Sequence, residues 1–146
     1  MIETMIATSS SFDLSLLPYQ RIEGMKEEDL ASYLIDEDKK LILLALDKKV
    51  IAFVAFSISL DEAEIDYLAI RKEEEGKGYS NQLLHNAFKL LKKEYQTKTV
   101  FLEVREHNIR ATSLYEKNGF ILYRKRKNYY LSPVEDALCY RKELVP

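Results

Sequence analysis

Residues 75–80 read Glu-Gly-Lys-Gly-Tyr-Ser and join two strongly patterned stretches of the chain. Residues 63–70 before them alternate between apolar and polar side chains, which predicts a strand. Residues 79–93 after them carry one apolar stripe, which predicts an amphipathic helix. A strand, a glycine turn and a helix in this order bring free backbone N–H groups and the positive end of a helix to one point. The segment is therefore predicted to cradle phosphate.

The chemistry of this turn agrees with phosphate binding. Gly76 and Gly78 allow positive φ and close approach, while Lys77 and Ser80 offer charge and a hydroxyl donor. Two glycines before a helix are also common in ordinary tight turns, and that interpretation stays open. The segment is neither a Walker P-loop nor a complete dinucleotide fingerprint, because the Gly-Lys-Ser/Thr run and the third glycine are missing.

The remaining pattern predicts a mixed α/β fold. Residues before about 23 have no clear pattern; a helix over 26–35 is followed by a hairpin whose two strands meet at Asp47-Lys48-Lys49. The two hairpin strands are expected at 40–46 and 50–60. Three further strands are expected at 99–104, 120–125 and 137–144. A second helix is expected at 110–117, closed by Asn118-Gly119. This order predicts a central sheet with at least one right-handed crossover and helices on both faces.

Length and composition predict one domain over residues 1–146. The chain is 47% hydrophobic and 32% charged with a formal net charge of −2, so nucleic acid is not expected as the main partner. The single cysteine, Cys139, reads as a core residue in a reducing cytoplasm, and no export signal or membrane span is expected. The basic run at 124–127 reads as a solvated strand end rather than an anion site. We expect a monomer or weak dimer.

A second run is more specific than the glycine turn. Residues 101–120 read FLEVREHNIRATSLYEKNGF. With the turn at 75–80, this run resembles the GNAT superfamily of acetyl-CoA-dependent N-acetyltransferases, whose motifs are Q/R-x-x-G-x-G/A and L-x-V-x-x-x-N-x-x-A-x-x-L-Y-x-x-x-G-F. The segments 61–70, 128–130 and 135–138 narrow the likeness to the RimI-like ribosomal-protein alanine N-acetyltransferases. The first motif departs at Glu75 and Ser80, where the family has Gln/Arg and Gly/Ala.

The resemblance implies a mostly antiparallel GNAT-like sheet and a coenzyme site built from two segments. The end of the first strand would offer backbone N–H groups to the acetyl carbonyl and pantetheine arm, and the turn would hold the pyrophosphate. Asn108 would contact the pantetheine arm, although a helix N-cap also accounts for an asparagine there. The expected acetyl-CoA site consists of Leu68, Ala69, Ile70, Glu75, Gly76, Lys77, Gly78, Tyr79, Ser80, Asn108 and Tyr115.

Two residues are expected to carry the chemistry. Tyr115 matches the family's tyrosine near the coenzyme sulfur and would act as general acid; the alternative is a core aromatic on its helix. Glu103 lies between two apolar strand residues, so its side chain faces away from their core. It is the candidate base, and an exposed or salt-bridged glutamate, paired with Arg105, is the alternative.

The sequence says less about the residues that would bind the acceptor amine. Tyr129 and Tyr130 would line a peptide groove, or pack across the sheet. His85 and His107 lack partners at metal-ligand spacing, so no metal is expected. The leading hypothesis is transfer of acetyl from acetyl-CoA to the N-terminal α-amine of a ribosomal or similar protein, by direct attack in a ternary complex. Acetylation of a small amine (a polyamine, amino acid or aminoglycoside) and a non-catalytic acyl-CoA-binding module are the alternatives.

Overall fold

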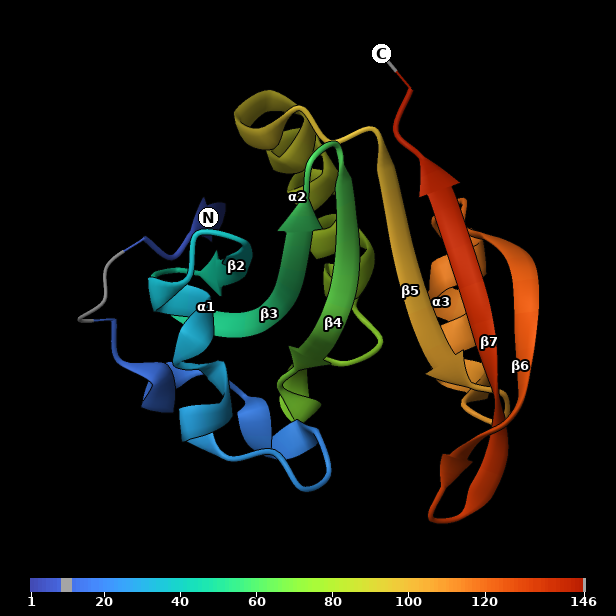
Figure 1. Ribbon diagram of the computed structural model, residues 1–146. Coiled ribbons are helices and arrows are strands. Elements are labelled where there is room, and N and C mark those ends of the chain that lie inside the picture. Colours follow the sequence, from blue (N-terminus) through green and yellow to red (C-terminus); the bar gives the residue numbers. More distant parts are fainter. Residues whose placement is uncertain (9–11, 146) are drawn as a thin grey trace.

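The computed structural model describes residues 1–8 and 12–145, which form one seven-stranded sheet in the order β1-β2-β3-β4-β5-β7-β6 (Figure 1). The pair β4–β5 is parallel and the other neighbouring pairs are antiparallel. The strands are β1 (Ile2–Ile6), β2 (Lys39–Leu46), β3 (Lys49–Ser59), β4 (Glu62–Ile70), β5 (Thr99–Arg105), β6 (Ile121–Leu131) and β7 (Val134–Glu143). The helices are α1 (Ser32–Ile35), α2 (Tyr79–Tyr95) and α3 (Ile109–Lys117), with short 3-10 turns η1 (Leu14–Leu16), η2 (Tyr19–Arg21), η3 (Glu27–Leu30) and η4 (Lys72–Glu74).

The mixed, mostly antiparallel sheet predicted from the sequence is confirmed, and three elements differ from or add to the expectation. Strand β1 lies in the stretch before residue 23 that the sequence leaves unassigned, and its residues 2–6 pair antiparallel with residues 42–46 of β2. The expected helix over 26–35 is the 3-10 turn η3 followed by the single turn α1. Strands β6 and β7 extend toward each other beyond the expected 120–125 and 137–144, because they form a long hairpin.

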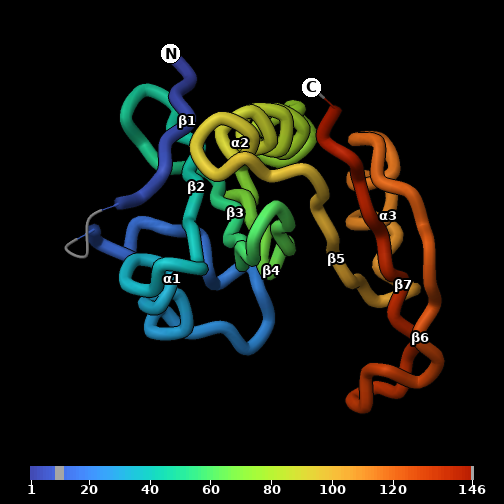
Figure 2. The backbone as a smooth tube through the Cα atoms, turned by 45° about the horizontal axis from the view of Figure 1, so that its top comes forward, coloured from blue at the N-terminus to red at the C-terminus, as the bar shows by residue number. Residues whose placement is uncertain are grey.

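Two apolar layers lie on opposite faces of the sheet. The apolar stripe of α2 and the α3 residue Tyr115 pack with β2–β5 and β7 in one core cluster. On the other face, Leu17, Leu30 and Tyr33 from the segment before β2 pack on β2 and β3. Figure 2 shows α1 and α2 on opposite sides of this part of the sheet. Cys139 is fully buried, as expected.

The sheet splits where β4 and β5 separate. Their pairing covers Glu62↔Thr99 to Glu64↔Phe101. Immediately afterwards, β4 has a bulge against β3, since Phe56 pairs with Ile65 while Ala55 pairs with Tyr67, leaving Asp66 as the extra residue. A bulge bends its strand and increases the local twist. The two strands diverge beyond this point (Figure 1).

Candidate functional site

The space between the diverging strands is a cavity of about 550 Å³. Its walls come from the end of β4, the glycine turn, the start of α2, the middle of β5 and one side of α3. All of the expected coenzyme and catalytic residues except Lys77 line it, namely Leu68, Ala69, Ile70, Glu75, Gly76, Gly78, Tyr79, Ser80, Glu103, Asn108 and Tyr115. Residues 68–80 and residues 103–115, which are well separated in sequence, thus form one site.

The glycine turn leaves the start of α2 open to the cavity. Gly76 and Gly78 have φ of +76° and +84°, a left-handed conformation that favours glycine. No side chain caps α2, and its first helical hydrogen bond runs from Gln82 N to Gly78 O. The N–H groups of residues 79–81 precede that bond, so they are available to an anion. This uncapped helix end fits the coenzyme pyrophosphate that the turn was expected to hold.

The charged residues of the turn are paired with other side chains. Lys77 Nζ lies 2.9 Å from Glu74 Oε1. Glu75, the departure from the family motif, contacts Arg21 through Oε1 and lies 2.9 Å from Arg110 Nη2 through Oε2. These guanidinium groups, Arg110 first, lower the pKa of the Glu75 carboxyl. The negative charge next to the turn is therefore neutralised by two arginines.

The end of β4 presents unpaired backbone to the cavity. Leu68, Ala69 and Ile70 pair with β3 on one side, and the pairing with β5 on the other side has already ended at Glu64. Alternate N–H and C=O groups along this edge consequently face the cavity without strand partners. An acyl carbonyl and a pantetheine amide would satisfy such groups.

Tyr115 is a core aromatic that also lines the cavity. Its ring packs edge-on against Phe120 with centroids 5.6 Å apart, and only 8% of the residue is exposed. Burial raises the pKa of its hydroxyl to about 12. The phenol thus keeps its proton at neutral pH.

Glu103 reaches the cavity from the opposite face of β5. Its neighbours Leu102 and Val104 are buried in the core with α2 and α3, as strand alternation predicts. The Glu103 carboxylate lies 3.0 Å from Arg126 Nε of β6, so its ion-pair partner is Arg126 and not the expected Arg105. Tyr115 and Glu103 therefore line one cavity from two faces of the sheet.

Carboxylates gather on the Glu103 face. Burial raises the pKa of Glu64, and the nearby charges of Asp66 and Glu103 raise it further. Asp66, at the bulge, accepts hydrogen bonds from the Tyr33 hydroxyl at 2.6 Å and the Ser57 hydroxyl at 2.5 Å. This face of the cavity therefore suits a cationic acceptor such as an ammonium group.

Asn108 caps α3. Its Oδ1 accepts a hydrogen bond from Ala111 N at 3.1 Å, and the residue also lines the cavity. The capping role expected from the sequence is confirmed.

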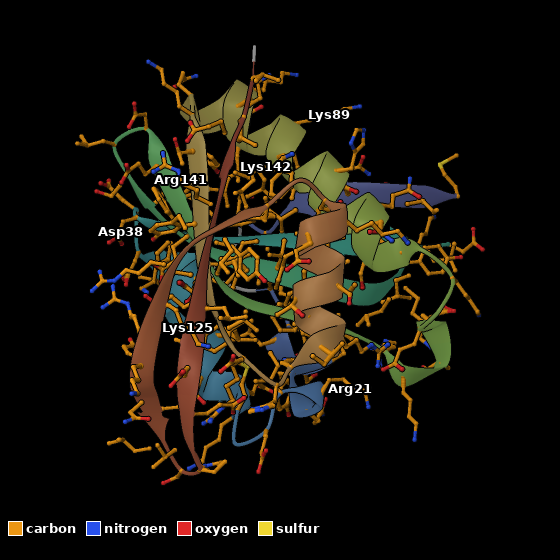
Figure 3. The ribbon with its side chains drawn as sticks, turned by 90° about the vertical axis from the view of Figure 1, so that its right-hand side faces the viewer. Arg21, Asp38, Lys89, Lys125, Arg141 and Lys142 are labelled. Carbon is orange, nitrogen blue, oxygen red and sulfur yellow. The ribbon has the colours of Figure 1, made fainter. Side chains whose placement is uncertain are left out.

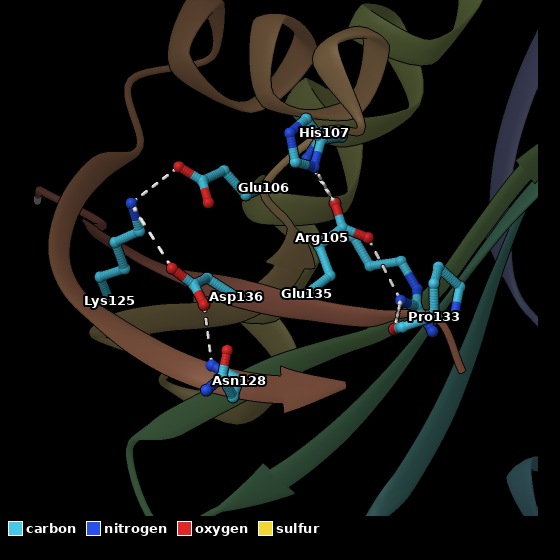
Figure 4. Close-up of polar contacts among 8 residues, drawn as sticks. All are labelled: Arg105, Glu106, His107, Lys125, Asn128, Pro133, Glu135 and Asp136. Atoms are coloured by element: carbon cyan, nitrogen blue, oxygen red, sulfur yellow. Dashed lines mark hydrogen bonds and ion pairs between the residues drawn. The ribbon is translucent and has the colours of Figure 1, made fainter. Parts of the chain in front are cut away.

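A network of charges fixes the β6–β7 hairpin to the loop after β5 (Figure 4). Glu135 accepts a hydrogen bond from His107 N at 2.6 Å and lies 3.2 Å from Arg105 Nη1. Arg105 also stacks on the Tyr130 ring at 4.2 Å, and Tyr130 packs edge-on against Tyr129. Neither tyrosine lines the cavity itself. They flank the Glu103 face from the hairpin.

Some partners of the site cannot be recognised from sequence motifs. Arg21 and Arg126 lie far from Glu75 and Glu103 in sequence, and only the sheet brings them together. Arg110 belongs to a recognised motif but at a variable position. The bulge at Asp66 has no sequence signal that we identify.

The described ranges 1–8 and 12–145 contain no group of three His, Cys, Asp or Glu side chains placed to hold a metal ion. Within the same ranges, no helix has the length and hydropathy needed to cross a membrane.

Comparison with protein families gives a match to the acetyltransferase (GNAT) family over residues 8–120. Curated relatives include the [ribosomal protein bS18]-alanine N-acetyltransferases of Haemophilus influenzae, 40% identical over 87 residues, and of Escherichia coli strain K12, 34% identical over 87 residues. Each match covers 60% of this chain and 58% of the relative, so the chain spans about three fifths of the length of these proteins.

Solved structures share the whole fold. The ribosomal-protein-S18-alanine N-acetyltransferase of Escherichia coli superposes with a TM-score of 0.82 at 28% identity, covering 99% of this chain and 96% of that one. A GNAT family acetyltransferase from Elizabethkingia anophelis, crystallised with acetyl-CoA bound, has a TM-score of 0.79 at 20% identity and covers 98% of each chain.

Proposed function

Because the chain belongs to the GNAT acetyltransferase family, we propose that it transfers an acetyl group from acetyl-CoA to the α-amine at the N-terminus of a protein. The observation that carries the proposal is the cavity that both Tyr115 and Glu103 line, beside the uncapped start of α2. The relatives that act on ribosomal protein bS18 support a protein N-terminus as acceptor. A GNAT protein solved with acetyl-CoA supports the co-substrate.

The residues fit the coenzyme in two places. The N–H groups at the start of α2, with the left-handed turn at Gly76 and Gly78, would hold the pyrophosphate. The unpaired edge of β4 at residues 68–70 and Asn108 would hold the pantetheine arm and the acyl carbonyl. Acetyl-CoA supplies an acetyl group activated as a thioester.

The positions of Glu103 and Tyr115 on two sides of the cavity support a separate proton-transfer role for each residue. Glu103, on the carboxylate-rich face, would receive the proton of the acceptor ammonium, directly or through water, which frees the nitrogen lone pair for attack. The C–N bond then forms as the C–S bond breaks. Tyr115, protonated and on the α3 side, would give its proton to the departing sulfur. The second proton that the nitrogen loses on becoming an amide would then return to the Tyr115 phenol through water. Direct transfer requires both substrates bound at once, and the cavity is lined by residues from both faces of the sheet, one for each substrate.

The hairpin would guide the acceptor. Tyr129 and Tyr130 stand beside the Glu103 face and are held there by Arg105 and Glu135. An extended peptide with its amine at Glu103 would run along this surface.

Acetylation of a small polyamine is a second candidate, favoured by the three carboxylates Glu64, Asp66 and Glu103 on the acceptor face. Turnover of acetyl-CoA should be measured with three acceptors: a peptide with a free N-terminus, the same peptide with a blocked N-terminus and one internal lysine, and spermidine. Activity confined to the free N-terminus supports the proposal. Equal use of the blocked peptide contradicts it, and a preference for spermidine selects the second candidate.

A further inference from the structure

Three charged side chains from separate elements meet at the mouth of the cavity. Arg21 ends the 3-10 turn η2, Glu75 follows η4, and Arg110 is the second residue of α3. Glu75 lies between the two arginines, touching Arg21 with one carboxylate oxygen and Arg110, at 2.9 Å, with the other. Figure 3 labels Arg21 near one end of α3. We call these three residues the mouth triad, and all of them line the cavity.

The mouth triad is positive in spite of Glu75. Two guanidinium groups and one carboxylate give a net charge of 2 − 1 = +1, and the guanidinium groups lower the pKa of Glu75, so the carboxyl stays ionised at neutral pH. Each arginine contacts Glu75 through Nη2. A guanidinium has five N–H donors, so both arginines retain donors for a further anion. Their side chains are 38% and 67% exposed and therefore accessible.

The anion expected at this place is a phosphate. The uncapped start of α2 and the glycine turn border the same cavity as the mouth triad. A guanidinium matches the geometry of phosphate and binds it through paired hydrogen bonds. At the position where the family motif has Gln or Arg, this chain has an acid, and Arg21 and Arg110 are the positive side chains that pair with it.

We propose that Arg21 and Arg110 bind phosphate groups of coenzyme A and that Glu75 is the counter-ion from which the coenzyme takes them. The inference rests on the proposed function, since it assigns residues to the same coenzyme. Glu75 then has two effects: it keeps the arginines at the mouth when the cavity is free, and it competes with the phosphates for them. Its charge also repels the incoming phosphates. Removing that charge strengthens coenzyme binding.

Calorimetric titration with coenzyme A, which needs no turnover, tests the proposal. Arg110→Gln and Arg21→Gln should each raise the Kd for coenzyme A about tenfold, the effect of losing one charged hydrogen-bonding partner. Glu75→Gln should lower the Kd about threefold. Arg124→Gln, on strand β6 away from the mouth, is the matched control and should leave the Kd unchanged.

Two further measurements sharpen the result. Dephospho-coenzyme A lacks the 3′-phosphate, so titration with it identifies the phosphate that Arg110 binds. If Arg110→Gln still binds this compound more weakly than wild type does, Arg110 binds the pyrophosphate. If the two proteins bind it equally well, Arg110 binds the 3′-phosphate. Arg110→Lys keeps the charge without the planar fork and should lie between wild type and Arg110→Gln. Thermal unfolding without ligand checks that each variant is folded.

The outcomes separate this inference from the proposed function. Wild-type binding of coenzyme A with unchanged Kd in both arginine variants, or weaker binding in Glu75→Gln, overturns the role of the mouth triad. Normal binding with the expected shifts but no acetyl transfer contradicts the proposed function and leaves the triad standing. A wild-type protein that does not bind coenzyme A overturns both.

Discussion

At the scale of single residues, Tyr115 shows how burial changes the acidity of a phenol. A phenol in water has a pKa near 10, and burial between α3 and the sheet raises that of Tyr115 to about 12. The charged form is disfavoured because the core cannot solvate it. The phenol is protonated at neutral pH with or without this shift, and burial makes it a weaker acid. Its use as a donor therefore depends on its position, which packing against Phe120 holds.

Tyr115→Phe keeps the packing and removes the donor. We expect kcat for acetyl transfer to fall by about 10² to 10⁴-fold, the usual contribution of a positioned acid, with little change in the KM for acetyl-CoA. Steady-state kinetics measures both. Tyr95→Phe, at the far end of α2, is the control and should keep wild-type values. A wild-type kcat in Tyr115→Phe would remove the tyrosine from the mechanism.

Glu103→Gln removes the proposed base while keeping the size of the side chain. We expect kcat/KM to fall by about 10²-fold or more at neutral pH, because the acceptor ammonium then lacks a proton acceptor. The loss should shrink as pH rises, since the acceptor amine deprotonates in solution before it binds. A pH series of initial rates tests this. Glu106→Gln, in the adjoining loop, is the control and should keep the wild-type kcat/KM across the pH series. A loss of kcat/KM in Glu103→Gln that does not change with pH would argue against Glu103 as the base.

At the scale of elements, the turn before α2 depends on glycine conformation. Gly78 has φ of +84°, and an added Cβ would meet nothing within 4 Å, so the cost of Gly78→Ala is backbone strain of about 1–2 kcal/mol. Gly24, with φ of +77° and equally open surroundings, is a matched control on the surface. Both alanine variants should lose similar stability in chemical denaturation. Only Gly78→Ala should also weaken coenzyme A binding, because its methyl group lies beside the helix start; equal binding in both variants would contradict the site.

The sequence predicts elements well where the information is local. The turn at 75–80, the stripe of α2 and the alternation around Glu103 are each contained in one short stretch, and the structure has all three. Strand β1 cannot be assigned from its own residues because its stability comes from pairing with β2, some 40 residues away. The partners of Glu75 and Glu103 were missed or misassigned for the same reason: Arg21 and Arg126 meet them only in the folded sheet.

At the scale of the whole molecule, the site exists because the sheet splits. The core is built on residues that face α2 and α3, while the gap between β4 and β5 opens from the bulge at Asp66. Local patterns predict each strand, but the divergence depends on how two strands twist relative to each other. A cleft that joins both faces is therefore a property of the assembled sheet.

Glu135 connects three parts of this assembly, namely β5, the loop before α3 and the β6–β7 hairpin. The backbone N–H of His107, and then Arg105, lower the pKa of its carboxyl below the ordinary 4.5. A depressed pKa adds stability above the unfolded value, and that stability is lost as pH falls through the lower folded value. We therefore expect the melting temperature of wild type to drop below about pH 4.5, and Glu135→Gln to melt lower at pH 7 with a smaller further drop in acid. Thermal unfolding by circular dichroism between pH 7 and pH 3 measures the difference, with Glu94→Gln as an exposed control. Parallel curves for wild type and Glu135→Gln would mean that the hairpin is held by packing and that the carboxylate adds nothing.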